Sequence, residues 1–168
     1  MDEVSRMKED PRTAVANEPN PAVRIRRAAV ADAAEIARLS AQFGHPVLVR
    51  ELCTRIAKLD AMPSQHLLVA EDPGASARLL GWLQAERRLV LTAGERAEII
   101  GLVVDTAARR RGVGTLLINA VQQWALAANL GQIVVRSNVV RDASHEFYLA
   151  RGFSRVKTQH IYAKSLAG

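Results

Sequence analysis

The sequence has little cysteine and few aromatic residues. Cys53 is the only cysteine among 168 residues, so no disulfide can form within the chain. Its apolar neighbours predict a small side chain buried on a helix. Aromatic residues make up 4% of the chain and do not alternate with the basic residues, which argues against a surface that stacks single-stranded nucleic acid. The cysteine content favours a cytoplasmic location, where thiols stay reduced.

Long hydrophobic runs are absent as well. No apolar stretch approaches the roughly 20 residues that a membrane-spanning helix needs. The N-terminus has no apolar segment of the kind found in signal peptides, and we expect no membrane partner. With 49% apolar and 24% charged residues, the composition is that of a globular protein, and the length suits one domain.

Two further motifs are missing. There is no G-x-S-x-G turn, which a serine hydrolase of the α/β type would need. The four histidines, His45, His66, His145 and His160, show no metal-ligand spacing with carboxylates or with Cys53. We therefore expect no metal and interpret the histidines as surface or packing residues.

Positive charge is in excess but unevenly distributed. The formal net charge is +6, yet residues 1–21 hold three basic and five acidic side chains, so the rest of the chain is more basic still. These first 21 residues contain Pro11, Pro19 and Pro21 and no sustained apolar period, which predicts a disordered tail before a domain at 22–168. A basic domain suits an anionic ligand, and nucleic acid is one candidate.

Apolar periodicity predicts alternating strands and helices in the remainder. Asp32 is expected to cap the first helix with Glu35 as its partner, and Gly131 to end the third. A hairpin is expected around Asp72-Pro73-Gly74. The order indicates an α/β fold with a mixed sheet and helices on both faces. The strands are predicted at 23–28, 66–71, 79–90, 97–105, 132–137, 153–157 and 160–165, and the helices at 32–43, 47–59, 113–128 and 143–152.

The segment VDTAARRRGVGTLLINAVQQWA (104–125) is unusual because two glycines stand where an amphipathic helix should begin. Each glycine inside a helix costs about 1 kcal/mol relative to alanine. The first amides of a helix lack intrahelical partners and lie at the positive end of its dipole, and glycine lets an anion approach them. With three arginines directly before Gly112, the segment predicts a diphosphate site.

Two common diphosphate motifs do not match this segment. A Walker loop requires Gly-Lys followed by Ser or Thr, but Gly114 is followed by Thr115 and Leu116. A dinucleotide fingerprint requires a third small residue where Leu117 stands.

The pattern Arg109-x-x-Gly112-x-Gly114 instead resembles the Q/R-x-x-G-x-G/A motif of the GNAT superfamily of acyl-CoA N-acyltransferases. SNVVRDASHEFYLARGF (137–153) is similar to the closing segment of that family, and the resemblance covers about residues 23 to 165. It implies a mixed, mostly antiparallel central β-sheet flanked by helices on both faces.

The resemblance also implies a binding mode for acetyl-CoA, the acyl donor. The pantetheine arm would lie along Leu102, Val103 and Val104, and Asn138 would contact it or shape the gap beside it. Arg141 and Ser144 would reach the 3′-phosphate or the adenosine. The diphosphate would be held by the main-chain amides of Arg109, Arg110, Arg111, Gly112, Val113, Gly114 and Thr115.

For catalysis the resemblance implies a base, an oxyanion donor and an acid. An alkyl amine has a pKa near 10, so it must lose a proton before it can attack. Glu98 is the candidate base, with Glu95 and Glu86 as the nearest replacements. The amide of Val103 would stabilise the oxyanion, and Tyr148 would protonate the departing thiolate.

The sequence thus predicts an N-acetyltransferase that acts on a small-molecule amine or a protein N-terminus by direct attack in a ternary complex. Two other functions stay open at this point: a non-catalytic acyl-CoA-binding regulatory module, against which Glu98 and Tyr148 count, and a nucleic-acid binder. The acceptor is not identified, although His45 lies in a loop that would wall its pocket. Oligomeric state is equally open, a homodimer included.

Overall fold

The computed structural model describes residues 23–72, 74, 78–138 and 142–166. The expected tail at 1–21 lies outside them. Within the described residues the α-helices are α1 (Ala33–Gln42), α2 (Val49–Asp60), α3 (Val113–Ala127) and α4 (Asp142–Leu149), with 3-10 turns η1 (Val30–Asp32) and η2 (Thr106–Ala108). The strands are β1 (Arg24–Arg27), β2 (Gln65–Glu71), β3 (Leu79–Val90), β4 (Gly94–Val104) and β5 (Ile133–Val135).

The strands form one sheet in the order β1-β2-β3-β4-β5. The first four are antiparallel to their neighbours, and β5 runs parallel to β4. This confirms the mixed, mostly antiparallel sheet and the β2–β3 hairpin. Strand β4 begins at Gly94, earlier than expected, because it closes a second hairpin in which Val90 faces Gly94.

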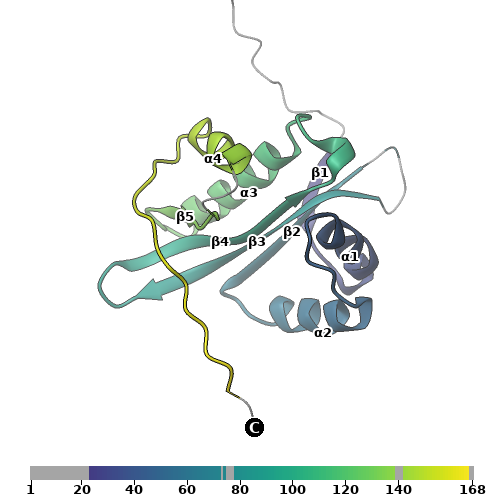
Figure 1. The fold of residues 1–168 in the computed structure, drawn as a ribbon, viewed down its shortest axis with the longest axis horizontal. Helices are drawn as coiled ribbons and strands as arrows, with labels where there is room; N and C mark the ends of the chain where they lie inside the picture. Colours follow the sequence, from purple (N-terminus) through teal and green to yellow (C-terminus); the bar gives the residue numbers. More distant parts are fainter. Residues whose placement is uncertain (1–22, 73, 75–77, 139–141, 167–168) are drawn as a thin grey trace, which may run out of the picture.

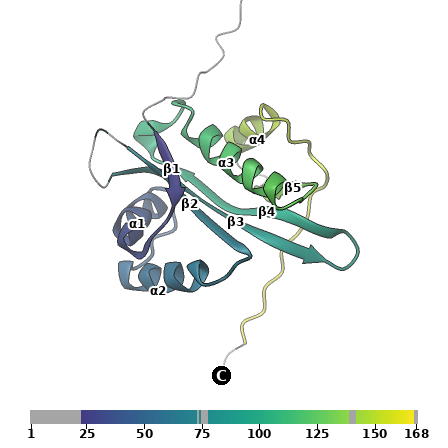
Figure 2. The ribbon, with the colours of Figure 1, turned by 180° about the vertical axis from the view of Figure 1, so that it is seen from behind.

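Helices cover both faces of the sheet, as predicted. Helix α3 lies on one face with α4 beside it, and α1 and α2 lie on the other (Figures 1 and 2). Leu83, Leu117 and Val121 belong to the buried cluster beneath α3, while Leu39 and Val69 belong to the cluster beneath α1 and α2. The central strands are therefore buried from two sides, which accounts for the continuous apolar sequence of β4.

Strand β4 carries a bulge in the middle of the sheet. Gly101 faces Gln84, but Ile99 already faces Ala85, so Ile100 is an extra residue without a partner on β3. Its side chain is 49% exposed although it stands on a central strand. Bulges redirect side chains and occur often beside active sites.

Of the two predicted helix caps, one is right in position only and the other is wrong. Asp32 is the N-cap residue of α1, but its carboxylate accepts hydrogen bonds from the Ala29 amide and from Arg26 instead of from α1, and Glu35 bonds to Arg38. At the C-terminal end of α3 the left-handed residue is Asn129, with φ 55°, and not Gly131 as predicted. The Leu130 amide then bonds to the Ala125 carbonyl. Asn tolerates this conformation and comes first in the chain, so Gly131 is not needed for the turn.

The two strands predicted at the C-terminal end are also absent from the structure. Residues 154–166 are exposed and follow an extended path away from the sheet (Figure 1). Their sequence alternates like a strand, but a strand exists only when a neighbour accepts its hydrogen bonds. Helix α4 likewise stops at Leu149, and Gly152 then turns the chain with φ +81°.

Candidate active site

The predicted diphosphate segment forms a turn between β4 and α3. Arg110 and Gly112 both have positive φ, at 61° and 80°, and Gly112 is the residue from which α3 starts. The Leu116 amide makes the first bond of the helix, to the Gly112 carbonyl at 3.0 Å. The amides of Val113, Gly114 and Thr115 precede that bond and have no acceptor inside the helix, so the turn presents donors suited to an anion.

The two glycines of the turn serve different purposes. Gly112 adopts a left-handed conformation that side chains disfavour. Gly114 is buried under α4, and a Cβ there would come within 2.9 Å of the Phe147 ring. The second glycine thus leaves room for the Phe147 ring of α4, a role that the sequence did not reveal.

Behind the turn lies a cluster of charged residues that sequence reasoning missed. Asp105 is 2% exposed and accepts hydrogen bonds from the Ala107 amide at 3.0 Å and from Arg38 at 2.9 Å. Arg38 also binds Glu35 and the Leu79 carbonyl, and Glu35 accepts from the Leu79 amide. The only signal in the sequence is a polar residue directly after a buried strand.

The hydrogen bonds of this cluster stabilise its carboxylates in the charged form. Burial by itself would raise the pKa of Asp105, but the bonds from the Ala107 amide and Arg38 outweigh it and hold this pKa below its ordinary value of 3.8. The bond from Arg38 lowers the pKa of Glu35 in the same way. The cluster therefore ties α1 and β3 to the start of the turn.

Strands β4 and β5 separate next to this turn. They pair only from Ala97 with Ile133 to Ile99 with Val135, whereas β4 continues to Val104. Along Leu102, Val103 and Val104 the edge of β4 away from β3 has no strand partner among the described residues. This edge has the backbone groups that an extended ligand arm could pair with.

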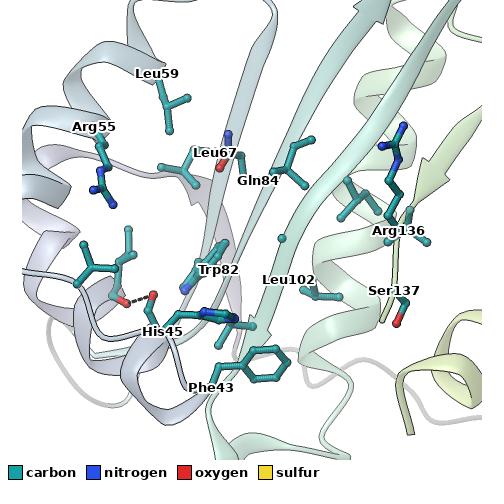
Figure 3. A pocket seen from close by; sticks show the side chains of 18 of the residues that line it. Phe43, His45, Arg55, Leu59, Leu67, Trp82, Gln84, Leu102, Arg136 and Ser137 are labelled. Carbon is teal, nitrogen blue, oxygen red and sulfur yellow. Dashed lines mark hydrogen bonds between the residues drawn. The ribbon is translucent and has the colours of Figure 1, made fainter. Parts of the chain in front are cut away.

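A cavity of about 380 Å³ begins in this gap and continues beneath α1 and α2 (Figure 3). Its volume is in the range of small-ligand sites. It is lined from the gap side by Leu102, Val103, Val135, Ser137, Asn138, Ser144 and Tyr148, and from the other side by Phe43, His45, Arg55, Trp82 and Gln84, among others.

The structure thus brings together five of the predicted site residues in one cavity: Leu102, Val103, Asn138, Ser144 and Tyr148. The Tyr148 ring packs edge-on between Phe147 and Phe153, which sets its position on α4. The turn from Arg109 to Thr115 and Val104 do not line the cavity, and Arg141 lies outside the described residues.

Glu98 is buried in the sheet and surrounded by arginines. Its carboxylate lies 3.3 Å from Arg88, 3.0 Å from Arg96 and 3.0 Å from Arg136. It does not line the cavity itself, but Arg136 does, so the two are joined by one ion pair. The replacements Glu86 and Glu95 are also paired, with Arg88 and Arg87 respectively.

The histidines differ in their surroundings. His45 lines the cavity, as expected for the loop after α1. His66 stacks on Trp124 with ring centroids 4.7 Å apart, and burial lowers its pKa, followed by the charge of Arg27. Across the described part of the chain, no three His, Cys, Asp or Glu side chains are grouped so that they could hold a metal ion. No helix there is long and apolar enough to span a membrane.

Comparison with known proteins agrees with this geometry. Residues 31–153 match the model of the Acetyltransferase (GNAT) family. The chain is 34% identical over 134 residues to the "Probable glucosamine 6-phosphate N-acetyltransferase 2" of Oryza sativa subsp. japonica, covering 75% of this chain and 81% of the relative. It is 32% identical over 73 residues to an aminoglycoside N(6')-acetyltransferase type 1 of Klebsiella aerogenes, covering 44% of this chain and 48% of the relative.

Among solved structures, an aminoglycoside acetyltransferase from an uncultured soil metagenomic sample, in complex with trehalose, superposes with a TM-score of 0.74. The match covers 88% of this chain and 99% of that one at 23% identity, so it supports the fold alone. The assignment as an acetyltransferase rests on the family match and on the relatives of known class. With its turn before α3 and its gap between β4 and β5, the chain belongs to the GNAT family of acetyltransferases and is an N-acetyltransferase.

Proposed function

We propose that this protein transfers an acetyl group from acetyl-CoA to a primary amine by direct attack within a ternary complex. The observation that carries the proposal is the single cavity that reaches from the β4–β5 gap to the space under α1 and α2. Such a cavity can hold a donor and an acceptor together. Cys53 is not among its lining residues, which favours direct transfer over an acylated cysteine.

The residues present fit coenzyme A. The amides of Val113, Gly114 and Thr115 would bind the diphosphate together with the preceding arginine loop, which is exposed at Arg109, Arg110 and Arg111. The unpaired edge at Leu102, Val103 and Val104 would bind the pantetheine arm. Asn138 lines the cavity at the gap in support of this. Ser144 and Arg141 remain candidates for the 3′-phosphate or the adenosine.

The cavity residues can supply the steps of acyl transfer. The thioester provides an activated acetyl group; the amine nitrogen forms a bond to its carbonyl carbon, and the carbon–sulfur bond breaks. The Val103 amide, expected to stabilise the oxyanion, is turned toward β3: the Asp105 amide bonds to the Leu80 carbonyl, and Val103, two residues earlier in the same antiparallel ladder, faces the same way. We therefore assign stabilisation of the oxyanion to the Leu102 amide, which faces the open edge of β4, and protonation of the thiolate to the Tyr148 hydroxyl. Leu102 and Tyr148 both line the gap side of the cavity.

We assign removal of the amine proton to Glu98, the only acid within the part of β4 that faces β5 and a residue joined to the cavity through Arg136. Because three guanidinium groups hold its oxygens, Glu98 must act through a water at the cavity wall. A purely structural alternative is that Glu98 fixes Arg136 in place. The two roles differ in their pH dependence.

We expect Glu98→Gln to lower kcat at neutral pH by about 10²- to 10⁴-fold, since glutamine cannot accept a proton. The loss should shrink as pH rises and the free amine becomes abundant, while calorimetric affinity for acetyl-CoA stays unchanged. Thiol release over a panel of amines measures this, and Glu146→Gln on the exposed side of α4 serves as the control.

A higher KM for the acceptor with an unaltered pH profile would instead make Glu98 a positioning residue and remove it as the base. Unchanged turnover of the variant would remove both roles.

Two finer expectations remain predictions. A cytoplasmic location is consistent with use of acetyl-CoA, and fractionation of cells tests it. A homodimer is supported by the extended segment 154–166, whose exposed Val156, Ile161 and Tyr162 could pair with a second copy. Sedimentation at several protein concentrations measures it.

A further inference from the structure

We propose that the acceptor is a small primary amine that also carries an anionic group, a carboxylate or a phosphate. Arg55 binds the anion, and the side-chain oxygen of Gln84 orients the amine. The inference rests on the proposed function, because it names the second substrate of the same cavity.

The charge of the cavity wall is the first argument. Arg55 enters from α2 and Arg136 from the opposite wall after β5 (Figure 3), and His45 lies between the two walls. None of the described lining residues is aspartate or glutamate. Glu51 and Glu98, which pair with Arg55 and Arg136, do not line the cavity themselves.

Arg55 is suited to exchange its present partner for a ligand. Its Nη2 donates a hydrogen bond to Glu51 at 3.0 Å, an i,i+4 pair along α2. The two side chains are 57% and 45% exposed, and exposed pairs of this kind contribute little to stability. The remaining guanidinium donors can bind a carboxylate or phosphate in a forked geometry.

The orientation of the Gln84 amide follows from a chain of hydrogen bonds. Glu86 can only accept, so the bond of 3.1 Å from Gln65 must come from the Gln65 amide nitrogen. The Gln65 oxygen is then left to accept from the Gln84 nitrogen at 3.0 Å. Gln84 Oε1 is thereby an acceptor in the cavity wall, opposite Gly101 and next to the bulge at Ile100.

Trp82 provides a second donor in the same cavity. Its indole Nε1 is buried and has no hydrogen-bond partner among the described residues, although most buried donors in proteins are satisfied. An oxygen of an acceptor bound between Arg55 and Gln84 would satisfy it. The cavity therefore presents donors for an anion on one side and an acceptor for an amine near β4.

A polycationic acceptor fits this wall poorly, because each additional ammonium group would meet arginine without a balancing carboxylate. The aminoglycoside acetyltransferases that share the fold do not decide the matter, since one fold serves many substrates.

Matched acceptors test the proposal: glucosamine 6-phosphate against glucosamine for phosphate, glycine against glycinamide for carboxylate, and kanamycin as a polycation. We expect at least one anionic member to exceed its uncharged partner in kcat/KM by about tenfold or more, as a charge-assisted hydrogen bond allows. Which pair responds tells phosphate from carboxylate. A preference for kanamycin, or equal use within both pairs, overturns the proposal while leaving amine acetylation intact.

The Arg55→Gln variant localises the effect. It should raise KM for the anionic acceptor by about 10- to 100-fold with little change in kcat, and leave the uncharged partner unaffected. Arg50→Gln, on the same helix but outside the cavity, is the matched control and should change neither. Equal losses for both acceptors would show that Arg55 acts only on the structure and would overturn its assignment.

Binding gives a readout independent of turnover. All proteins in this experiment carry Trp124→Phe, so that the fluorescence comes from Trp82 alone. In the presence of coenzyme A, the anionic amine should quench this fluorescence with the wild-type Arg55 and with Arg50→Gln, but not with Arg55→Gln. No binding of any anionic amine overturns the inference. Failure of calorimetry to detect acetyl-CoA, together with no thiol release from any amine, contradicts the proposed function and the inference with it.

Discussion

Asp105 is the buried carboxylate on which the start of the diphosphate turn depends. It caps η2, receives Arg38 from α1 and lies 3.5 Å from Arg78. Asp105→Asn should lower the free energy of unfolding by about 2 to 4 kcal/mol, because breaking a buried pair leaves its partners unsatisfied. Denaturant unfolding measures the loss. Asp60→Asn, which weakens an exposed pair with Arg27, should have almost no effect.

The pH dependence supplies the control for this prediction. The pKa of Asp105 is lower in the folded state than its ordinary 3.8, so the unfolded chain binds more protons as the solution is acidified below about pH 4. The stabilisation is complete above that pH and is lost as the pH falls through the folded-state pKa. The difference in the free energy of unfolding between the wild type and Asp105→Asn should therefore become smaller in acid. A constant difference would mean that Asp105 acts through packing.

Gly114→Ala tests whether α4 or the ligand requires the second glycine. Alanine improves helix propensity by about 1 kcal/mol. A Cβ 2.9 Å from Phe147 should outweigh this gain, and overpacking typically costs about 1 to 3 kcal/mol. We expect lower thermal stability that Phe147→Leu restores in the double variant. A stable single variant that has lost acetyl-CoA affinity would place the constraint at the ligand.

At the scale of elements, residue patterns predicted the regular core well. The apolar stripe of α3 and the alternation of β2 and β3 reflect each residue's own environment, so the sequence carries them. Pairing between distant segments is different. The bulge at Ile100 and the short β5 depend on register across the sheet, and the Asp105–Arg38 pair joins residues 67 positions apart. No local period encodes such contacts.

The C-terminal segment shows the same limit and yields a prediction. Residues 154–166 alternate like strands yet are exposed, whereas Phe153 packs against Tyr148. Truncation after Phe153 should change the free energy of unfolding by less than about 1 kcal/mol, as is usual for exposed positions. Truncation after Gly152 should lower the free energy of unfolding by about 2 kcal/mol more, because the contact of Phe153 with Tyr148 is then lost. Thermal unfolding of both forms checks this, and a large loss from the first truncation would show that the segment packs on the fold.

At the scale of the whole molecule, the excess positive charge admits two kinds of anionic ligand. A nucleic acid contacts many phosphates over a wide surface, whereas acetyl-CoA brings a few phosphates to one turn. At 0.1 M salt, charges more than about 10 Å apart are largely screened. The basic surface as a whole therefore contributes little to a ligand that sits at a single turn.

Salt dependence separates the two ligands. A protein that contacts 6 to 10 phosphates of duplex DNA loses about 10³- to 10⁵-fold in affinity between 50 and 200 mM salt. We expect the calorimetric affinity for acetyl-CoA to fall by no more than about tenfold over that range, because main-chain amides at the start of α3 are fixed dipoles with no counterions to release. Replacing the three arginines together (Arg109→Gln, Arg110→Gln and Arg111→Gln) should make the affinity for acetyl-CoA even less dependent on salt, while binding stays measurable. A steep slope that these substitutions abolish would mean that the arginines, and not the helix amides, hold the diphosphate.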